Sequence, residues 1–322
     1  MRAIVVHETG GPDQLRLEDV AEPEPGPGEM VVRVEAAGLN FIDTYHRIGL
    51  YPVELPFTPG LEGAGTVLRT GEEVEGFANG DRVAWCSALG SYAEQVVVPA
   101  EKAIPIPDGV GSDQAAAVLL QGITAHYLAA DTFPLDVGDR CLIHAGAGGV
   151  GLLLTQIARM RGAYVITTVG SEEKVELSRA AGANDVIVYT DVDFKEAIED
   201  IFGPHGLDVV YDGVGAATFD KGIDLLRPRG MMVTFGNASG PVPPIPPLLL
   251  SQKGSLFLTR PTMAHYLRTR EELLSRAEDL LDWVAEGALE VLIGSEYPLS
   301  RAAEAHLALE GRRTSGKVLI RP

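Results

Sequence analysis

The stretch GDRCLIHAGAGGVGLLLTQIAR, residues 138–159, constrains the fold more than any other part of the chain. A short apolar run, typical of a buried strand, leads into glycines and then into an apolar segment of helical length. Ala145, Gly148 and Gly151 fit an A-x-x-G-x-x-G frame. With Gly146 as the first position the same stretch fits G-x-G-x-x-G, so two registers are open. Either register predicts a dinucleotide-binding turn at the amino end of a helix.

Strand-like and helix-like segments alternate after this turn. The expected strands are YVITTV, DVIVY, LDVVYDGV and GMMVTFG, and the expected helices lie near 149–161, 172–181, 194–202 and 217–226. This order predicts a parallel sheet covered on both faces. The proline-rich GPVPPIPPLLL that follows is either a stiff connector or a wall of the ligand cleft, and SLFLT is expected as the last strand.

The first third of the chain has a different texture. Short β-type runs such as MVVRVEA, GTVLRT and YAEQVVVPA are separated by Gly/Pro/Glu turns, which indicates a partly closed β-domain. A helix follows, with Ser112 or Asp113 as its N-cap. Near the end, Thr269 and Glu272 fit a capping box on an amphipathic helix, and GKVLIRP is predicted to return as a strand to the first domain.

Composition excludes several function classes. The net charge of −19 and pI of about 4.7 disfavour binding to nucleic acid. No apolar segment reaches the roughly 20 residues that a membrane span needs. Two cysteines, Cys86 and Cys141, cannot form a disulfide framework in a chain of 322 residues, which fits a reducing compartment. We therefore expect a soluble cytoplasmic protein.

The end of the second predicted strand indicates which nucleotide binds. NAD sites usually place Asp or Glu there, whereas this chain has Gly170 and Ser171. Ser171 and Tyr189 offer hydroxyl donors, and Lys174 offers a positive charge, as a 2′-phosphate requires. The two glutamates after Ser171 argue for NAD, but residues at a helix entrance can point outward. The sequence therefore favours NADPH.

Several motifs in order resemble one family along essentially the whole chain. AAGLNFIDTYHRIGLYP, TPGLEGAG, the glycine turn, VVYDGVG, TFGNASG and KGSLFLTRP are similar to the zinc-independent quinone oxidoreductases, of zeta-crystallin type, in the medium-chain dehydrogenase/reductase superfamily. The resemblance implies an α/β fold with a GroES-like, partly closed β-barrel catalytic domain over 1–123 and 264–322. A Rossmann domain, a doubly wound parallel sheet over 124–263, would bind NADPH. It also implies homodimers or homotetramers that pair Rossmann-sheet edges, here SLFLT.

The same resemblance implies a set of cofactor contacts. Near the nicotinamide these are Asn40, Phe41, Ile42 and Thr124. At the pyrophosphate they are Gly148, Gly149 and Val150, and at the 2′-phosphate Ser171, Lys174 and Tyr189. Further contacts are Phe235, Gly236, Asn237, Leu258, Thr259 and Arg260. Relatives tend to have Lys where this chain has Gln121, which leaves an electrostatic role at that position open.

The segment PFTPGLEGAG lacks the ligands of a catalytic zinc site. Zinc relatives use Cys where this chain has Asn40 and His where it has Leu61, and Glu62 alone would hold no metal. The four-cysteine structural lobe of the zinc enzymes is absent, and the histidines lie singly. We therefore expect no metal.

Without a Lewis acid, the substrate has to be intrinsically electrophilic, as quinones are. Hydride transfer from NADPH then needs mainly proximity and orientation. Asn40, Tyr45 and Tyr51 are the candidate hydrogen-bond donors, the two rings could stack on a flat acceptor, and Asp43 is expected to orient their loop. Two alternatives stay open: NADPH-dependent reduction of activated alkenes (enones, 2-alkenals or enoyl thioesters), and a non-catalytic, crystallin-like NADPH-binding protein.

Overall fold

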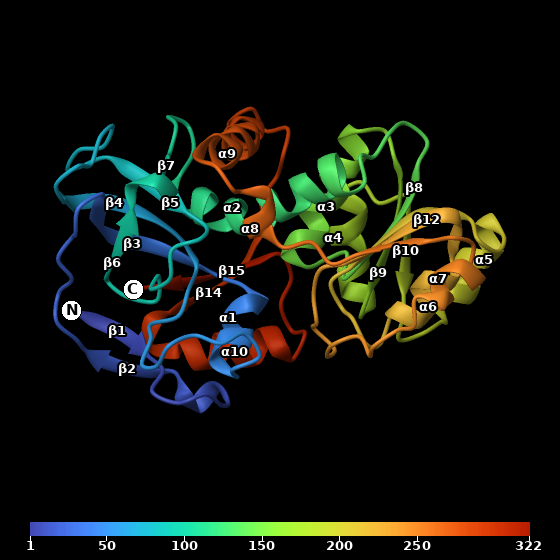
Figure 1. The fold of residues 1–322 in the computed structure, drawn as a ribbon, viewed down its shortest axis with the longest axis horizontal. Coiled ribbons are helices and arrows are strands. Elements are labelled where there is room, and N and C mark those ends of the chain that lie inside the picture. Colours follow the sequence, from blue (N-terminus) through green and yellow to red (C-terminus); the bar gives the residue numbers. More distant parts are fainter. The chain divides into compact units, whose positions relative to one another are not determined.

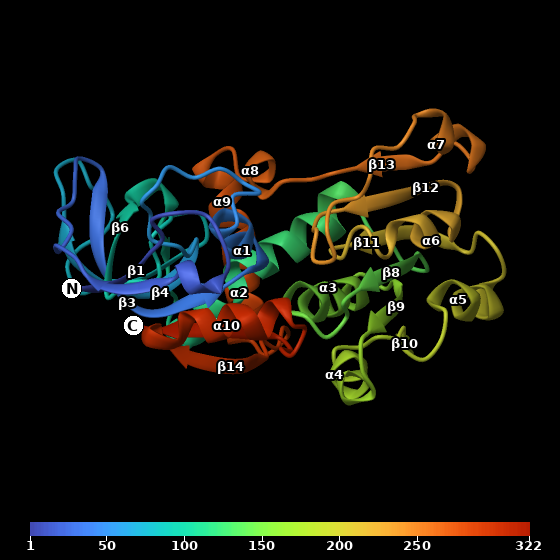
Figure 2. The ribbon, with the colours of Figure 1, turned by 90° about the horizontal axis from the view of Figure 1, so that it is seen from below.

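The computed structural model describes residues 1–322, and the chain divides into two compact units. Unit 1 comprises Met1–Ile123 and Arg268–Pro322, and unit 2 comprises Thr124–Leu267. The division differs from the expected domains only in residues 264–267, which lie in unit 2. Figures 1 and 2 show the elements of each unit.

Unit 2 contains a six-stranded parallel sheet in the order β10-β9-β8-β11-β12-β13. Its strands are β8 (Arg140–His144), β9 (Tyr164–Val169), β10 (Asp185–Val188), β11 (Leu207–Asp212), β12 (Leu226–Thr234) and β13 (Phe257–Thr259). Renumbered from β8, this order is 3-2-1-4-5-6, the Rossmann order. The predicted fold class is therefore confirmed for this unit, and SLFLT does form an edge strand.

Helices cover both faces of this sheet, as Figure 1 shows. They are α3 (Gly149–Met160), α4 (Val175–Ala180), α5 (Phe194–Phe202), α6 (Phe219–Asp224) and α7 (Leu248–Gln252). The short helix α8 (Met263–Tyr266) lies away from the sheet (Figure 2). Ile198 of α5 and Phe219 of α6 pack in one core cluster with Leu142 and Ile166 of the sheet. Thr167, which points to the other face, bonds Ser178 of α4 at 2.7 Å. Both faces are buried, as the continuous apolar strands predict.

Unit 1 contains a seven-stranded sheet and a two-stranded sheet formed by β1 (Arg2–Val5) and β2 (Arg16–Asp19). The larger sheet has the order β14-β15-β3-β4-β5-β7, with β6 paired to β3. Its strands are β3 (Glu29–Leu39), β4 (Glu62–Thr70), β5 (Arg82–Trp85), β6 (Gln95–Pro99), β7 (Ile104–Pro105), β14 (Ile293–Pro298) and β15 (Lys317–Arg321). The C-terminal strand β15 lies beside β3, so the chain's end returns to its first part as predicted.

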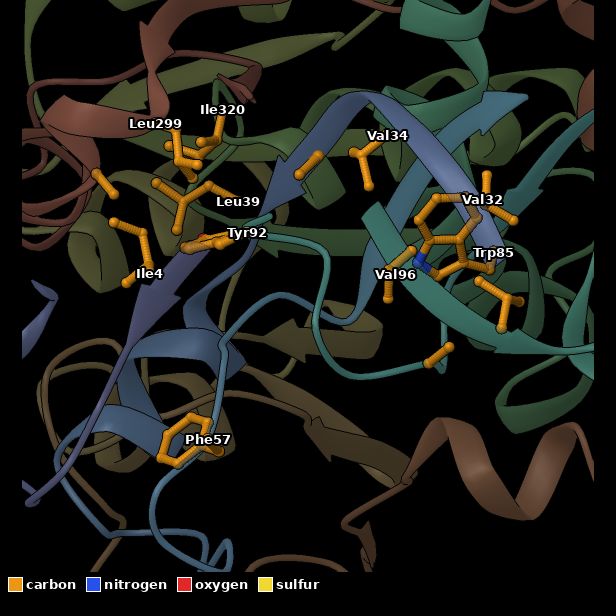
Figure 3. Packing of buried hydrophobic residues seen from close by; sticks show 14 of the residues in the cluster. Ile4, Val32, Val34, Leu39, Phe57, Trp85, Tyr92, Val96, Leu299 and Ile320 are labelled. Carbon is orange, nitrogen blue, oxygen red and sulfur yellow. The ribbon is translucent and has the colours of Figure 1, made fainter. Parts of the chain in front are cut away.

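The core of unit 1 joins residues from both ends of the chain. Ile4 and Leu39 pack with Leu299 and Ile320 from the C-terminal segment, and Trp85 lies farther along the same cluster (Figure 3). The helices around the sheets are α1 (Phe41–Arg47), α2 (Ser112–Tyr127), α9 (Arg270–Ala285) and α10 (Ala302–Glu310). Helix α2 begins in unit 1 and ends in unit 2.

One predicted helix cap is confirmed and another is wrong. Thr269 and Glu272 form the expected capping box of α9, whose apolar stripe is buried. Ser112 and Asp113, expected as N-cap candidates, instead lie inside the first turn of α2. Their side chains instead contact residues that are distant in the sequence: Ser112 donates to Glu35 at 2.6 Å, and Asp113 pairs with Arg321. Tertiary partners have replaced the local cap.

Candidate active site

The glycine turn after β8 is shaped by close approaches of its backbone to neighbouring backbone and side-chain atoms. Ala145 adopts a left-handed conformation, with φ of 57°. A Cβ at Gly151 would lie less than 3.0 Å from the carbonyl oxygen of Ala145, and a Cβ at Gly146 would meet Thr167 equally closely. Only glycine fits at these two positions without displacing the strand or the helix. The turn therefore requires glycine at positions 146 and 151 and a left-handed backbone at residue 145.

The amino end of α3 faces this turn. Gly148 is the N-cap residue, has an extended φ of −78°, and makes no side-chain cap bond. Gly149 and Val150 are the first helical residues. The first N–H groups of a helix have no partner within it, and the helix dipole adds a partial positive charge there. The turn thus presents backbone donors suited to an anionic group, and NADPH fits it through its pyrophosphate.

The predicted 2′-phosphate residues meet at the carboxyl end of β9. A Cβ at Gly170 would lie 2.8 Å from the Tyr189 hydroxyl, so these two residues are neighbours. The Lys174 N–H donates to the Ser171 carbonyl at 3.1 Å, which places both residues in one turn. Glu172 and Glu173 are exposed. Hydroxyl groups and a lysine at the strand end are compatible with a phosphate, whereas a carboxylate in the place of Gly170 or Ser171 would repel it.

The remaining cofactor candidates follow β12 and β13, at the same edge of the parallel sheet. Arg260 donates to the Gly236 carbonyl at 2.9 Å and to the Thr234 hydroxyl at 3.2 Å. With its amide placed to satisfy both polar atoms, Asn237 accepts from Arg260 at 3.0 Å. Phe235 precedes this pair and borders Gly213, while Leu258 and Thr259 form the end of β13. The arginine joins two neighbouring strand ends.

Asp212 is a residue of this edge that the sequence analysis missed. It ends β11, is fully buried, and accepts from the N–H groups of Val214 and Gly215 and from the Thr218 hydroxyl. This carboxylate folds the loop after β11 by hydrogen bonds to backbone and side-chain donors. An acidic residue at a strand end was visible in LDVVYDGV, but its partners were not.

In unit 1, α1 and the loop after it carry the predicted nicotinamide and substrate residues. Tyr45 and Tyr51 make an edge contact with ring centroids 5.3 Å apart, and Phe41 lies 6.1 Å from Tyr45. Tyr45 is 8% exposed, and Ile42 is half-buried beside it on the helix. These rings form one aromatic cluster of Phe41, Tyr45 and Tyr51; the sequence analysis placed the two tyrosines in one segment but did not predict their contact.

The side chain of Asn40 belongs to a buried polar cluster with Glu62 and Lys317. Its amide nitrogen donates to the Gly38 carbonyl at 3.1 Å and to Glu62 Oε2 at 2.8 Å. Its amide oxygen accepts from the Lys317 ammonium at 2.9 Å. Both N–H bonds of Asn40 are thus used inside the protein, so donation to a substrate would require one of them to break. Asn40 instead connects α1 to the ion pair between Glu62 and Lys317.

A second buried network surrounds Asp43. Its Oδ2 accepts from the Asn40 N–H at 2.9 Å and from the Tyr92 hydroxyl at 3.1 Å, while Oδ1 has no partner. Burial raises the pKa of Asp43 to about 7, against the opposing effects of those hydrogen bonds and of Lys317. The network continues through His306 to Arg47, which pairs with Glu310 at 2.7 Å. The expected orienting role of Asp43 has a structural basis here.

His306 stays uncharged in this network. Burial, reinforced by the neighbouring Arg47, lowers the pKa of His306 to about 3. Since the Arg47 guanidinium can only donate, it donates to Nδ1 of His306 across 3.0 Å. The imidazole therefore carries its proton on Nε2, which faces the Tyr92 hydroxyl at 3.3 Å. Hydrogen bonds thus run from Arg47 through His306 and Tyr92 to Asp43, and each residue donates to the next.

The position of the zinc ligands in related enzymes holds other side chains here. Leu61 is half-buried, and Glu62 is engaged by Lys317 and by the Leu120 N–H, which donates to Oε1 at 2.7 Å. In residues 1–322, no group of three or more His, Cys, Asp or Glu side chains is arranged to hold a metal ion. Cys86 and Cys141 are buried free thiols whose pKa is raised by burial.

Two further residues of α2 complete the candidate set. Thr124 is 8% exposed. The amide oxygen of Gln121, three residues earlier, has no hydrogen-bond partner. Since buried polar atoms are usually paired, an oxygen left over beside a predicted nicotinamide contact is consistent with a ligand that donates to it.

No helix in the chain is both long and apolar enough to cross a bilayer.

Together the two units define a class of nucleotide-dependent oxidoreductase, with a GroES-like unit and a Rossmann unit. Residues 26–108 match the alcohol dehydrogenase GroES-like domain family, and residues 149–286 match the zinc-binding dehydrogenase family. A quinone oxidoreductase of Pseudomonas aeruginosa is 44% identical, with 97% of each chain covered. Quinone oxidoreductase 1 of Escherichia coli is 41% identical over 99% of each. The chain belongs to the quinone oxidoreductase family.

Solved structures agree with these relatives. The Escherichia coli quinone oxidoreductase in complex with NADPH has a TM-score of 0.98 at 40% identity and covers 100% of both chains. A mycobacterial protein in complex with NADPH has a TM-score of 0.97 at 48% identity, also over 100% of both chains. A 2-haloacrylate reductase of a Burkholderia species is 42% identical, over 99% of this chain and 98% of its own. The family therefore includes an enzyme named for an alkene.

Proposed function

We propose that this chain transfers hydride from NADPH to a quinone without a bound metal ion. The observation that carries the proposal is the full-length similarity of this chain to quinone oxidoreductases. Two of the similar structures are complexes with NADPH. The glycine turn and the Ser171–Lys174 turn support it, because both fit the anionic groups of that nucleotide. Asn40 and Leu61 support the metal-free part, because neither can replace a Cys or His ligand.

The residues of the chain serve binding and orientation in this proposal. Bound NADPH supplies the hydride, and the acceptor becomes aromatic on reduction. Gly148, Gly149 and Val150 hold the pyrophosphate, and Ser171, Lys174 and Tyr189 hold the 2′-phosphate. Asn40, Phe41, Ile42 and Thr124 border the nicotinamide, and Phe235, Gly236, Asn237, Leu258, Thr259 and Arg260 border the rest of the cofactor. The aromatic cluster offers Tyr45 and Tyr51 as a stacking surface for a flat acceptor.

A second candidate is reduction of an activated alkene. The 42% identical 2-haloacrylate reductase favours it, because the same fold there serves an enzyme named for a different acceptor. The hydride would then add to the β-carbon of a double bond conjugated to a carbonyl group. The two candidates share the cofactor and differ only in the acceptor.

Steady-state NADPH oxidation with 9,10-phenanthrenequinone, a 2-alkenal and 2-chloroacrylate distinguishes these candidates. We expect a higher kcat/KM for the quinone, and activity that is unchanged after dialysis against EDTA. Turnover of the alkenes with no turnover of any quinone would establish the second candidate. Stoichiometric zinc bound to active protein, with activity lost on its removal, would refute the metal-free mechanism.

We further propose that the protein is a cytoplasmic homodimer or homotetramer. The edge strand β13 supports this, since Phe257 is 57% exposed there and an unpaired edge can extend a sheet across a two-fold axis. Sedimentation of the wild type and of Phe257→Glu tests it: we expect the variant to shift towards the monomer. A monomeric wild type would contradict the proposal.

A further inference from the structure

Lys317 is a lysine with almost no exposed surface, at 1%, paired with a carboxylate, Glu62, that has none. The two residues are 255 positions apart and come from β15 and β4. A Cβ at Gly38 would collide with the Glu62 carboxylate, with the Lys317 side chain and with the Ala116 carbonyl oxygen. Glycine on β3 therefore leaves room both for the ion pair and for the close approach of α2.

The ion pair has a third member that uses both of its polar atoms. The Asn40 oxygen accepts from the Lys317 ammonium at 2.9 Å, and the Asn40 nitrogen donates to Glu62 at 2.8 Å. The other Glu62 oxygen accepts from the Leu120 N–H of α2. Buried ion pairs often add little net stability compared with a packed apolar group. Stability alone therefore does not explain the ion pair at this place, whereas a need to hold Asn40 in a fixed position does.

Asn40 is the residue that immediately precedes α1. Its backbone N–H donates to Asp43, one turn into the helix. The next two residues, Phe41 and Ile42, are proposed cofactor contacts, and Tyr45 follows one turn later. Any rotation of Asn40 would therefore move the start of the helix that carries them. Productive hydride transfer requires such groups to be held to within about 0.5 Å.

We propose that Lys317 is a positioning residue, whose buried ammonium holds Asn40 and thereby fixes the first turn of α1. It donates to Asn40, the residue at the position where zinc relatives have a cysteine ligand. The proposal rests on the proposed function for its catalytic consequence, but the order of α1 is a property of unit 1 alone. Lys317 contacts neither hydride donor nor acceptor in this account; it acts through Asn40.

Two variants test the link. Lys317→Met/Glu62→Gln removes both charges together, so that no single charge is left buried, and the amide introduced at position 62 can still accept from the Leu120 N–H. Asn40→Ala keeps the ion pair and removes the amide that connects it to α1, together with that amide's bond to the Gly38 carbonyl and its part in the capping box of α1, so the double variant isolates the contribution of Lys317. We expect both to remain folded, with amide hydrogen exchange in residues 41–47 faster by about tenfold, and with NADPH bound about tenfold more weakly.

The matched control removes another short ion pair of the same strand. Arg321→Met/Asp113→Asn breaks the contact between β15 and α2, at 2.5 Å, and does not touch α1. We expect wild-type exchange in residues 41–47 for this control. Unchanged exchange in Asn40→Ala, or in the folded double variant, would overturn the proposal, as would equal acceleration in the control. Failure of the wild type to bind NADPH would refute the proposed function and leave the exchange result standing.

Discussion

The glycine turn of unit 2 and the buried polar cluster of unit 1 each hold a few groups in place, but by different means. In the turn, Ala145, Gly146 and Gly151 lie within seven consecutive residues, and close packing against the Ala145 carbonyl and the Thr167 side chain sets the geometry. In the cluster, Asn40, Glu62 and Lys317 come from distant parts of the chain, and charged side chains set it. The glycine turn can be recognised in a short stretch of sequence, whereas the polar cluster can be recognised only in the folded structure.

The comparison also predicts how each region fails. Steric exclusion leaves no alternative arrangement, so changes at the turn should have large effects that depend little on pH. The charge of a buried carboxyl group depends on protonation, so changes at Asp43 should depend on pH. The predictions below run from the largest expected effect to the smallest.

Gly151→Val should cause the largest loss. Its Cβ would lie less than 3.0 Å from the Ala145 carbonyl, so α3 or β8 has to move. We expect NADPH affinity to fall at least about a hundredfold, as measured by calorimetry. Gly111→Val is the control, because position 111 lies outside the turn, its φ is not left-handed and its Cβ would meet only the Gln114 side chain at 3.6 Å. Equal losses in both variants would show that the close approach at Gly151 is not the cause.

Asp43→Asn should stabilise the protein at alkaline pH and change little at acid pH. Because the pKa of Asp43 is raised to about 7, the folded state binds a proton that the unfolded state releases. This contribution to the free energy of unfolding is complete below about pH 4 and is lost as pH rises through 7. Its size is at most about 4 kcal/mol. Asn can still accept from the Asn40 N–H and the Tyr92 hydroxyl.

Urea unfolding from pH 4.5 to 8.5 measures this difference. The wild type should lose stability relative to Asp43→Asn between pH 4.5 and 8. The exposed residue Asp108, changed to Asn, provides the control for removal of one negative charge from this acidic protein. A difference between wild type and Asp43→Asn that stays constant over this range would mean that Asp43 does not titrate there.

Lys174→Ala should lower the preference for NADPH over NADH by about tenfold, since one point charge on a 2′-phosphate is removed. The ratio of kcat/KM values for the two nucleotides is the measurement. Arg179→Ala removes an exposed cation of α4, paired with Glu176, and should leave the ratio unchanged. A similar fall in both variants would indicate a general charge effect rather than a phosphate contact.

The aromatic cluster should show the smallest effects. Tyr51→Phe keeps the edge contact with Tyr45 and removes only a hydroxyl, so we expect kcat/KM for a quinone to fall less than about threefold. Tyr51→Ala, which removes the ring, should cost about tenfold. Equal losses for Phe and Ala would assign the contact with the acceptor to the hydroxyl and not to the stacking surface.

The sequence predicted the elements whose signals are local. The glycine turn, the alternating strands and helices of unit 2, the capping box at Thr269 and Glu272 and the return of GKVLIRP were each read from short windows, and the structure confirms them. The N-caps at Ser112 and Asp113 failed for a physical reason. Their partners, Glu35 and Arg321, lie 77 and 208 residues away, and a local pattern cannot show such competitors.

Composition and motif order thus determined the fold class, the nucleotide turn and the loss of the zinc ligands, because each depends on residue type within a few positions. Only the tertiary structure decided what replaces those ligands. It brings Lys317 to Asn40 and Glu62, and it encloses Asp43 with Tyr92, His306 and Arg47. The energy of a buried charge depends on which groups surround it, and that environment exists only when the distant segments have packed.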